Sequence, residues 1–120
     1  MTTEKRPPRI YIAGPYTRGG QATNVRNALL TADCLFNRGA VPFVPHLSHF
    51  WDMLTPHPYD AWTEYDLEWL RACDALFRLP GESAGADREE AEAVRLGLPV
   101  LRSLREADAF LKAWDERKEN

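Results

Sequence analysis

The 120-residue chain is 44% hydrophobic and 28% charged, with a formal net charge of −3, which is an ordinary composition for one globular domain. The negative charge and the lack of a Lys/Arg run argue against nucleic-acid binding, and no apolar run approaches the ~20 residues that span a membrane. Without a signal-peptide pattern, and with Cys34 and Cys73 lacking metal or redox spacing, the sequence favours a cytoplasmic protein with reduced thiols.

The first third of the chain is predicted to form a strand, a loop and a long amphipathic helix. A flexible tail over residues 1–8 precedes the strand, which covers residues 9–14 and ends at a Gly-Pro turn. The helix begins near Thr23 or Asn24, because either side chain can cap it. Its apolar residues then recur with helical spacing until Gly39 ends it.

A short strand and a long aromatic loop follow. Residues 41–44 form the strand, whose proline indicates an edge position, and residues 45–58 form an ordered loop with a turn or two of helix. Within the loop, His46, His49 and Asp52 stand three apart, which is a possible metal-ligand spacing. Because no fourth ligand or supporting pattern accompanies them, we favour ligand binding or capping and expect no metal.

The second half of the chain continues the alternation of helices and strands. Asp87 is predicted to cap one helix in a capping box with Glu90, and Ser103 with Glu106 forms a similar box before the last helix. The predicted helices cover residues 59–73, 86–97 and 104–114, the strands cover 74–79 and 98–101, and a frayed, charged tail covers 115–120.

This order of elements predicts a single α/β domain over residues 9–114. We expect a doubly wound, mostly parallel sheet of four to five strands, as in flavodoxin-like and Rossmann-like folds. Ligands in such folds bind at the carboxyl ends of the strands, beside the point where the strand order reverses. Residues 14–20, 45–58 and 80–86 all follow strands, so the sequence predicts one shared site there.

Two acidic residues stand at unusual positions. Glu89 precedes Ala93 and Leu96 by four and seven residues, which turns it toward the buried side of its helix, although periodicity does not separate it cleanly from Glu90. Asp66 lies between two tryptophans on a largely aromatic helix face, where a carboxylate is costly unless it is paired or functional. The structural alternatives are a first-turn acid that only favours the helix dipole, and a partly exposed Asp66 bonded to backbone.

Three motifs occur in order along most of the chain. Residues 11–15 read Tyr-Ile-Ala-Gly-Pro, Asp66 is followed eight residues later by Asp74, and residues 83–93 read Ser-Ala-Gly-Ala-Asp-Arg-Glu-Glu-Ala-Glu-Ala. In this order they resemble the nucleoside 2-deoxyribosyltransferase-like superfamily, in which the acid at the position of Glu89 is the nucleophile. The aromatic loop also resembles a short branch of that superfamily.

The resemblance has two departures. Residues 90–92 read Glu-Ala-Glu, where the superfamily has an apolar residue, a glycine, and an aromatic or basic residue. Ser83 stands where the transferases have aspartate, and it resembles the phosphate-contacting serine of the 2′-deoxynucleoside 5′-monophosphate N-glycosidases. Those enzymes also share the Arg-Gly-Gly of residues 18–20. This part of the resemblance implies a phosphorylated substrate.

The resemblance implies cleavage of an N-glycosidic bond in a nucleoside or nucleoside 5′-monophosphate, by hydrolysis or base transfer, in a homo-oligomer without cofactors. Glu89 would form a covalent glycosyl intermediate, Asp66 would protonate the leaving base, and Tyr11 would hold the Glu89 carboxylate. A non-catalytic nucleotide-binding module is the alternative, while a phosphoribohydrolase fits less well because its loop needs more glycines. The expected substrate-binding residues are Gly14, Arg18, Gly19, Gly20, His46, His49, Trp51, Ser83 and Gly85.

Overall fold

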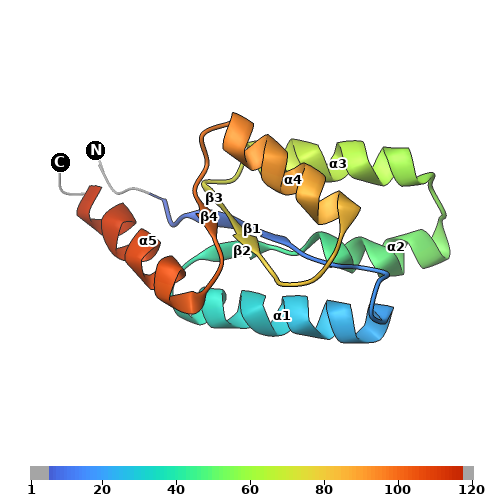
Figure 1. The fold of residues 1–120 in the computed structure, drawn as a ribbon, viewed down its shortest axis with the longest axis horizontal. Coiled ribbons are helices and arrows are strands. Elements are labelled where there is room, and N and C mark those ends of the chain that lie inside the picture. Colours follow the sequence, from blue (N-terminus) through green and yellow to red (C-terminus); the bar gives the residue numbers. More distant parts are fainter. Residues whose placement is uncertain (1–5, 118–120) are drawn as a thin grey trace.

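Four parallel strands form the central sheet of the structure, a computed structural model that describes residues 6–117 (Figure 1). Residues 1–5 and 118–120, which include parts of both expected tails, lie outside the described residues. The strands lie in the order β2-β1-β3-β4, and their parallel pairing confirms the predicted α/β fold. Their bounds are β1 (Arg9–Ala13), β2 (Val41–Phe43), β3 (Ala75–Arg78) and β4 (Val100–Leu101).

Helices cover both faces of the sheet, as a doubly wound fold requires (Figure 1). One face carries α1 and α5, and the other carries α3 and α4. A 3-10 turn and a short helix connect β2 to α3, so the predicted aromatic loop is largely helical. The bounds are α1 (Gln21–Asn37), η1 (Pro45–Leu47), α2 (Ser48–Leu54), α3 (Tyr59–Arg71), α4 (Ala84–Arg95) and α5 (Leu104–Arg117).

Alternation along β1 supplies both layers of the core. Ile10 and Ile12 pack into the α1–α5 layer, whereas Tyr11 and Ala13 pack into the α3–α4 layer. All four side chains are fully buried, because successive residues of a central strand point to opposite faces. Tyr11 is thereby the tyrosine that the sheet presents to the layer containing both candidate acids.

The strand order reverses beside β1, which lies between β2 and β3. The loops that follow β1 and β3 meet at this point. A Cβ added to Gly14 would lie 2.8 Å from the side chain of Leu79, and one added to Gly81 would lie 2.7 Å from Pro15 Cγ. These approaches need glycine, and they join the two loops into one packed unit.

The start of α1 differs from the prediction. The helix begins at Gln21 without a side-chain cap among the described residues, directly after Gly19 and Gly20, whose φ angles are +86° and +101°. The predicted cap Asn24 instead holds the preceding loop, because its Nδ2 donates to the carbonyl oxygen of Arg18 at 2.6 Å. The glycine pair therefore serves to turn the chain into the helix.

The start of α4 also differs from the prediction. Ser83 is the N-cap, since its Oγ accepts from the backbone N–H of Ala86 at 3.0 Å. Asp87 lies in the first turn instead, where its carboxylate pairs with Arg78. The second predicted capping box is present: the Ser103 Oγ accepts from the backbone N–H of Glu106 at 3.1 Å.

Both ends of the described chain are more ordered than the sequence indicated. Residues 115–117 continue α5 instead of beginning a frayed tail. Arg6 forms an ion pair with Asp74, and its carbonyl oxygen accepts from Trp114 Nε1 at 3.0 Å. Within residues 6–117, no helix has both the length and the apolar character needed to span a bilayer.

Candidate active site

A cavity of about 420 Å³ opens at the carboxyl ends of β1 and β3, where the sequence predicted a site. Its walls come from the β1–α1 loop, η1 and α2, one face of α3, and the first two turns of α4. This volume falls within the range of small-molecule binding sites. Glu89 and Asp66, which are 23 positions apart in the sequence and lie on different helices, both line it.

Glu89 faces the sheet from the second turn of α4. The buried hydroxyl of Tyr11 donates to its Oε2 at 2.6 Å, which ties the carboxylate to the central strand. Burial raises the pKa of Glu89 to about 7, although this hydrogen bond and the charges of Arg78 and Arg88 act in the opposite direction. The carboxylate is therefore desolvated, yet it has donors and cations that favour its charged form.

Asp66 reaches the same cavity from α3. Burial, followed by the negative charge of Glu89, raises its pKa to about 7. Its Oδ1 is buried and has no hydrogen-bond partner in the described part of the chain. The hydrogen bond from Tyr11 favours the ionised form of Glu89, whereas no hydrogen bond from residues 6–117 favours the ionised form at Asp66 Oδ1.

Replacing Asp66 with asparagine is expected to stabilise the fold above neutral pH. Folding raises the pKa of this carboxyl from 3.8 to about 7, so the folded protein loses stability as the pH rises through that interval. We expect the Asp66→Asn variant to exceed the wild type in free energy of unfolding by about 1–3 kcal/mol at pH 8 and to match it near pH 4. Urea unfolding at both pH values measures the difference; a gain independent of pH would contradict the raised pKa.

His46 forms a buried part of the opposite wall. Its ring is 4% exposed, and burial lowers its pKa, so the imidazole is neutral. The Nε2 lies 2.9 Å from the carbonyl oxygen of Pro15, which can only accept, and the proton therefore resides on Nε2. His46 thus holds the β1–α1 loop, and its Nδ1 is a buried acceptor without a partner among residues 6–117.

The three residues with a possible metal-ligand spacing, His46, His49 and Asp52, each bind a different partner. His49 Nδ1 contacts the Tyr16 hydroxyl, whereas Asp52 accepts from Trp62 Nε1 at 2.7 Å. His46 bonds backbone, as described above. Across residues 6–117, no group of three or more His, Cys, Asp and Glu side chains is arranged to hold a metal ion.

Only some of the residues expected to bind phosphate lie at the cavity. Arg18 and Ser83 line the cavity, whereas Gly19 and Gly20 lie outside its lining and form the turn before α1. The Arg18 guanidinium already forms an ion pair with Glu82, and both side chains are largely exposed. A phosphate at this position would therefore compete with Glu82 for Arg18, across a pair that water screens well.

Of the remaining expected binding residues, one lies outside the cavity. Gly14, Gly85, His46 and His49 contribute to the lining. Trp51 is not in the lining; its ring packs edge-on against that of the lining residue Trp62, with centroids 5.0 Å apart. Binding of substrate by Trp51 stays a prediction.

Several lining residues were missed by the sequence analysis. Tyr59 and Thr63 precede Asp66 by seven and three residues, so all three share one face of α3, and this spacing was visible in the sequence. Arg88 completes the rim, with its guanidinium carbon 5.9 Å from the centre of the Tyr59 ring. Nothing in the spacing of Arg88 distinguishes it from an ordinary exposed helix residue.

The fold is that of the 2-deoxyribosyltransferases. It is similar to the enzyme from Leishmania mexicana, with a TM-score of 0.58 and 22% identity over 79% of this chain, which spans only 63% of that protein. It is also similar to the enzyme from the psychrotolerant Bacillus psychrosaccharolyticus, with a TM-score of 0.55 and 22% identity over 83% of this chain and 80% of that one. Residues 8–103 match the model of the family described as a domain of unknown function, DUF7768, and the chain belongs to that family. No curated protein matches the sequence.

Proposed function

We propose that this protein cleaves the N-glycosidic bond of a nucleoside or nucleoside 5′-monophosphate through a covalent glycosyl–Glu89 intermediate. One observation carries the proposal: Glu89 and Asp66 face one cavity with raised pKa values, but Tyr11 donates a hydrogen bond to Glu89. A nucleophile must be an ionised carboxylate and a general acid must be a protonated carboxyl, so this reaction requires one group of each kind. The likeness to 2-deoxyribosyltransferases supports the same reaction class.

In the first step, a Glu89 oxygen attacks the anomeric carbon as the bond from that carbon to the base nitrogen breaks. Asp66 gives its proton to the departing base, and the sugar passes through an oxocarbenium-like transition state into an ester with Glu89. Burial and the Glu89 charge raise the pKa of Tyr11 well above its usual value, so its hydroxyl stays protonated. Tyr11 therefore acts as a fixed hydrogen-bond donor that orients the nucleophile.

In the second step, an acceptor attacks the anomeric carbon and releases the Glu89 carboxylate. When water is the acceptor, its proton passes to Asp66 and the products are free base and free sugar. When a second base is the acceptor, its ring nitrogen attacks, its proton passes to Asp66, and a new nucleoside forms. Either route restores one protonated and one ionised carboxyl.

The remaining lining offers separate regions for the other parts of a substrate. Tyr16, His49 and Trp62 supply aromatic surface for a base, whereas Arg18 and Ser83 supply a cation and a hydroxyl for a phosphate. We propose that a bound phosphate takes Arg18 from its ion pair with Glu82. Assembly into a homo-oligomer, which the superfamily resemblance implies, is also a proposal.

A panel of substrates tests this function. The purified protein is incubated with ribonucleosides, 2′-deoxynucleosides and their 5′-monophosphates, with and without a second free base, and the products are separated by liquid chromatography. Release of free base supports a hydrolase, and formation of a new nucleoside supports a transferase. Binding of nucleotides without either product would overturn the proposal and leave the non-catalytic binding module.

A further inference from the structure

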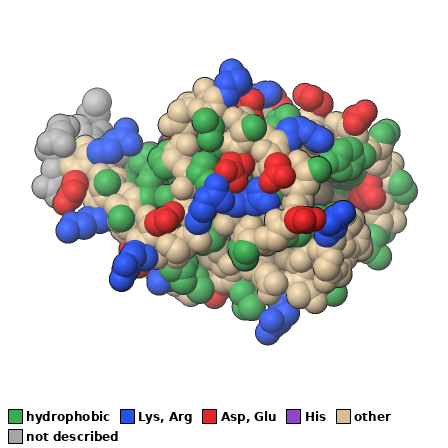
Figure 2. Space-filling model, viewed as in Figure 1, with side chains coloured by type: hydrophobic (Ala, Val, Ile, Leu, Met, Phe, Trp, Pro, Cys, Tyr) green, Lys and Arg blue, Asp and Glu red, His purple; other side chains and the backbone are tan. Residues whose placement is uncertain are grey.

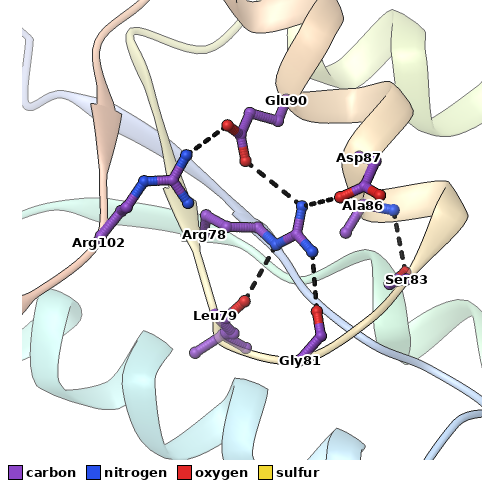
Figure 3. Close-up of polar contacts among 8 residues, drawn as sticks. All are labelled: Arg78, Leu79, Gly81, Ser83, Ala86, Asp87, Glu90 and Arg102. Atoms are coloured by element: carbon purple, nitrogen blue, oxygen red, sulfur yellow. Dashed lines mark hydrogen bonds and ion pairs between the residues drawn. The ribbon is translucent and has the colours of Figure 1, made fainter.

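Arg78, the last residue of β3, carries a buried positive charge beside the proposed site. Its side chain is only 9% exposed and lies on the α3–α4 side of the sheet, between the β3–α4 loop and α4 (Figure 3). Nε donates to the carbonyl oxygen of Leu79 at 3.0 Å, and Nη2 donates to that of Gly81 at 2.9 Å. One guanidinium therefore binds two carbonyl groups of the loop that leads to α4.

The same guanidinium also binds α4 directly. Its Nη1 donates to Asp87 at 2.7 Å and to Glu90 at 3.4 Å (Figure 3). These two acids stand immediately around Glu89 in the sequence, two residues before it and one after it. Glu90 pairs further with Arg102, which follows β4, so the network joins two strand ends to the helix.

The loop bound by Arg78 is confined on its other side as well. An added Cβ at Gly81 would approach Pro15 Cγ to 2.7 Å, so the loop lies against the end of β1. The loop then reaches Ser83, whose Oγ caps the first turn of α4. Because the cap fixes where the helix starts, the loop's position also fixes where Glu89 stands relative to Tyr11.

We propose that Arg78 is a positioning residue for Glu89: its guanidinium holds the β3–α4 loop and α4 in one geometry, and its buried charge favours the ionised carboxylate. The inference rests on the proposed role of Glu89. Arg78 lies outside the lining of the cavity, so it acts through the groups that it binds. A lysine could supply the charge, but its single ammonium group could not reproduce the planar fork that reaches carbonyls and carboxylates together.

The electrostatic part of this role has a definite sign. The Arg78 charge lowers the pKa of Glu89, in opposition to the larger effect of burial. Asp87 is largely exposed, so water weakens its neutralising effect on the inner guanidinium. Removing the Arg78 charge should therefore move the Glu89 pKa upward, whereas a purely structural contact would leave that titration unchanged.

The test measures the resting protein with carbon-13 labelled glutamate side chains. The Glu89 carboxyl resonance is assigned by its loss in Glu89→Gln and is then titrated in wild type, Arg78→Gln, Arg78→Lys and the matched control Arg102→Gln. We expect Arg78→Gln to raise the Glu89 pKa by at least about half a unit. Arg78→Lys should shift it less, and Arg102→Gln should leave it nearly unchanged because that guanidinium is largely exposed.

Amide hydrogen exchange across residues 81–86 reports the loop itself. Both Arg78 variants should exchange these amides at least about tenfold faster than wild type, because each loses the fork. A folded Arg78→Gln protein with a wild-type Glu89 titration would overturn the inference. If Arg78→Gln does not fold, the Arg78→Lys variant provides the test. Hydrogen exchange across residues 81–86 at the wild-type rate in Arg78→Lys would overturn the inference. Neither readout needs turnover, so a failure of the proposed reaction is detected separately by the substrate panel.

Discussion

Replacing Glu89 with glutamine is expected to reduce base release by at least about 1,000-fold, because the amide cannot form the glycosyl ester. The change keeps the size of the side chain and an acceptor oxygen for the Tyr11 hydroxyl, so the fold should persist. Initial rates on the best substrate of the panel, measured at pH 7 by liquid chromatography, give the ratio. Mass spectrometry of denaturant-quenched wild type should also detect the sugar attached to Glu89.

Glu92→Gln is the matched control for this variant. Glu92 lies three residues further along α4. Its carboxylate pairs with Arg71 and Arg95, and its side chain does not line the cavity. The control should retain nearly full activity. Base release that survives in Glu89→Gln, or that falls equally in the two variants, would show that Glu89 is not the nucleophile.

Replacing Asp66 with asparagine is expected to slow the release of ordinary bases by about 100-fold or more, because asparagine has no proton to transfer. The loss should nearly vanish for a nucleoside of 7-methylguanine, whose base already carries a positive charge and leaves as a neutral molecule. The ratio of kcat/KM for guanine and 7-methylguanine nucleosides, compared between wild type and variant, measures this effect.

The control for Asp66 is Glu68→Gln on the same helix. Glu68 is exposed and pairs with Arg71, so its replacement should leave both substrates unaffected. An Asp66→Asn variant that lost the same factor on both substrates would contradict proton donation. Such a result would instead indicate a role in binding the sugar or in shaping the cavity.

Strong periodic patterns made much of the fold predictable. The apolar residues of the first strand and its helix indicated buried faces, and the alternation of elements predicted a mostly parallel sheet with helices on both faces. The spacing of apolar residues in the helix of residues 86–97 indicated that Glu89 faces inward without separating it cleanly from Glu90, and in the structure Glu89 meets Tyr11. Asp66 was recognisable because a carboxylate on an aromatic helix face is costly to bury unless it is paired or functional.

Other features depended on contacts that a linear pattern does not contain. Ser83 and Asp87 are both good helix caps; in the structure Ser83 caps α4, whereas Asp87 pairs with Arg78. Arg78 itself resembled an ordinary strand-end cation, since its partners include loop carbonyls that any residue would supply. The direction in which Trp51 faces on its short helix likewise depends on a contact, its packing against Trp62.

Two adjacent strands supply the groups that act on Glu89, whereas the walls of the cavity come from loops and helices. Tyr11 belongs to β1 and Arg78 to its hydrogen-bonded neighbour β3, and both project toward the α3–α4 layer. If the proposed function holds, substitutions in these walls would alter which base is admitted while Tyr11 and Arg78 stay in place. Such a division would allow descendants of this chain to diversify in substrate choice without rebuilding their chemistry.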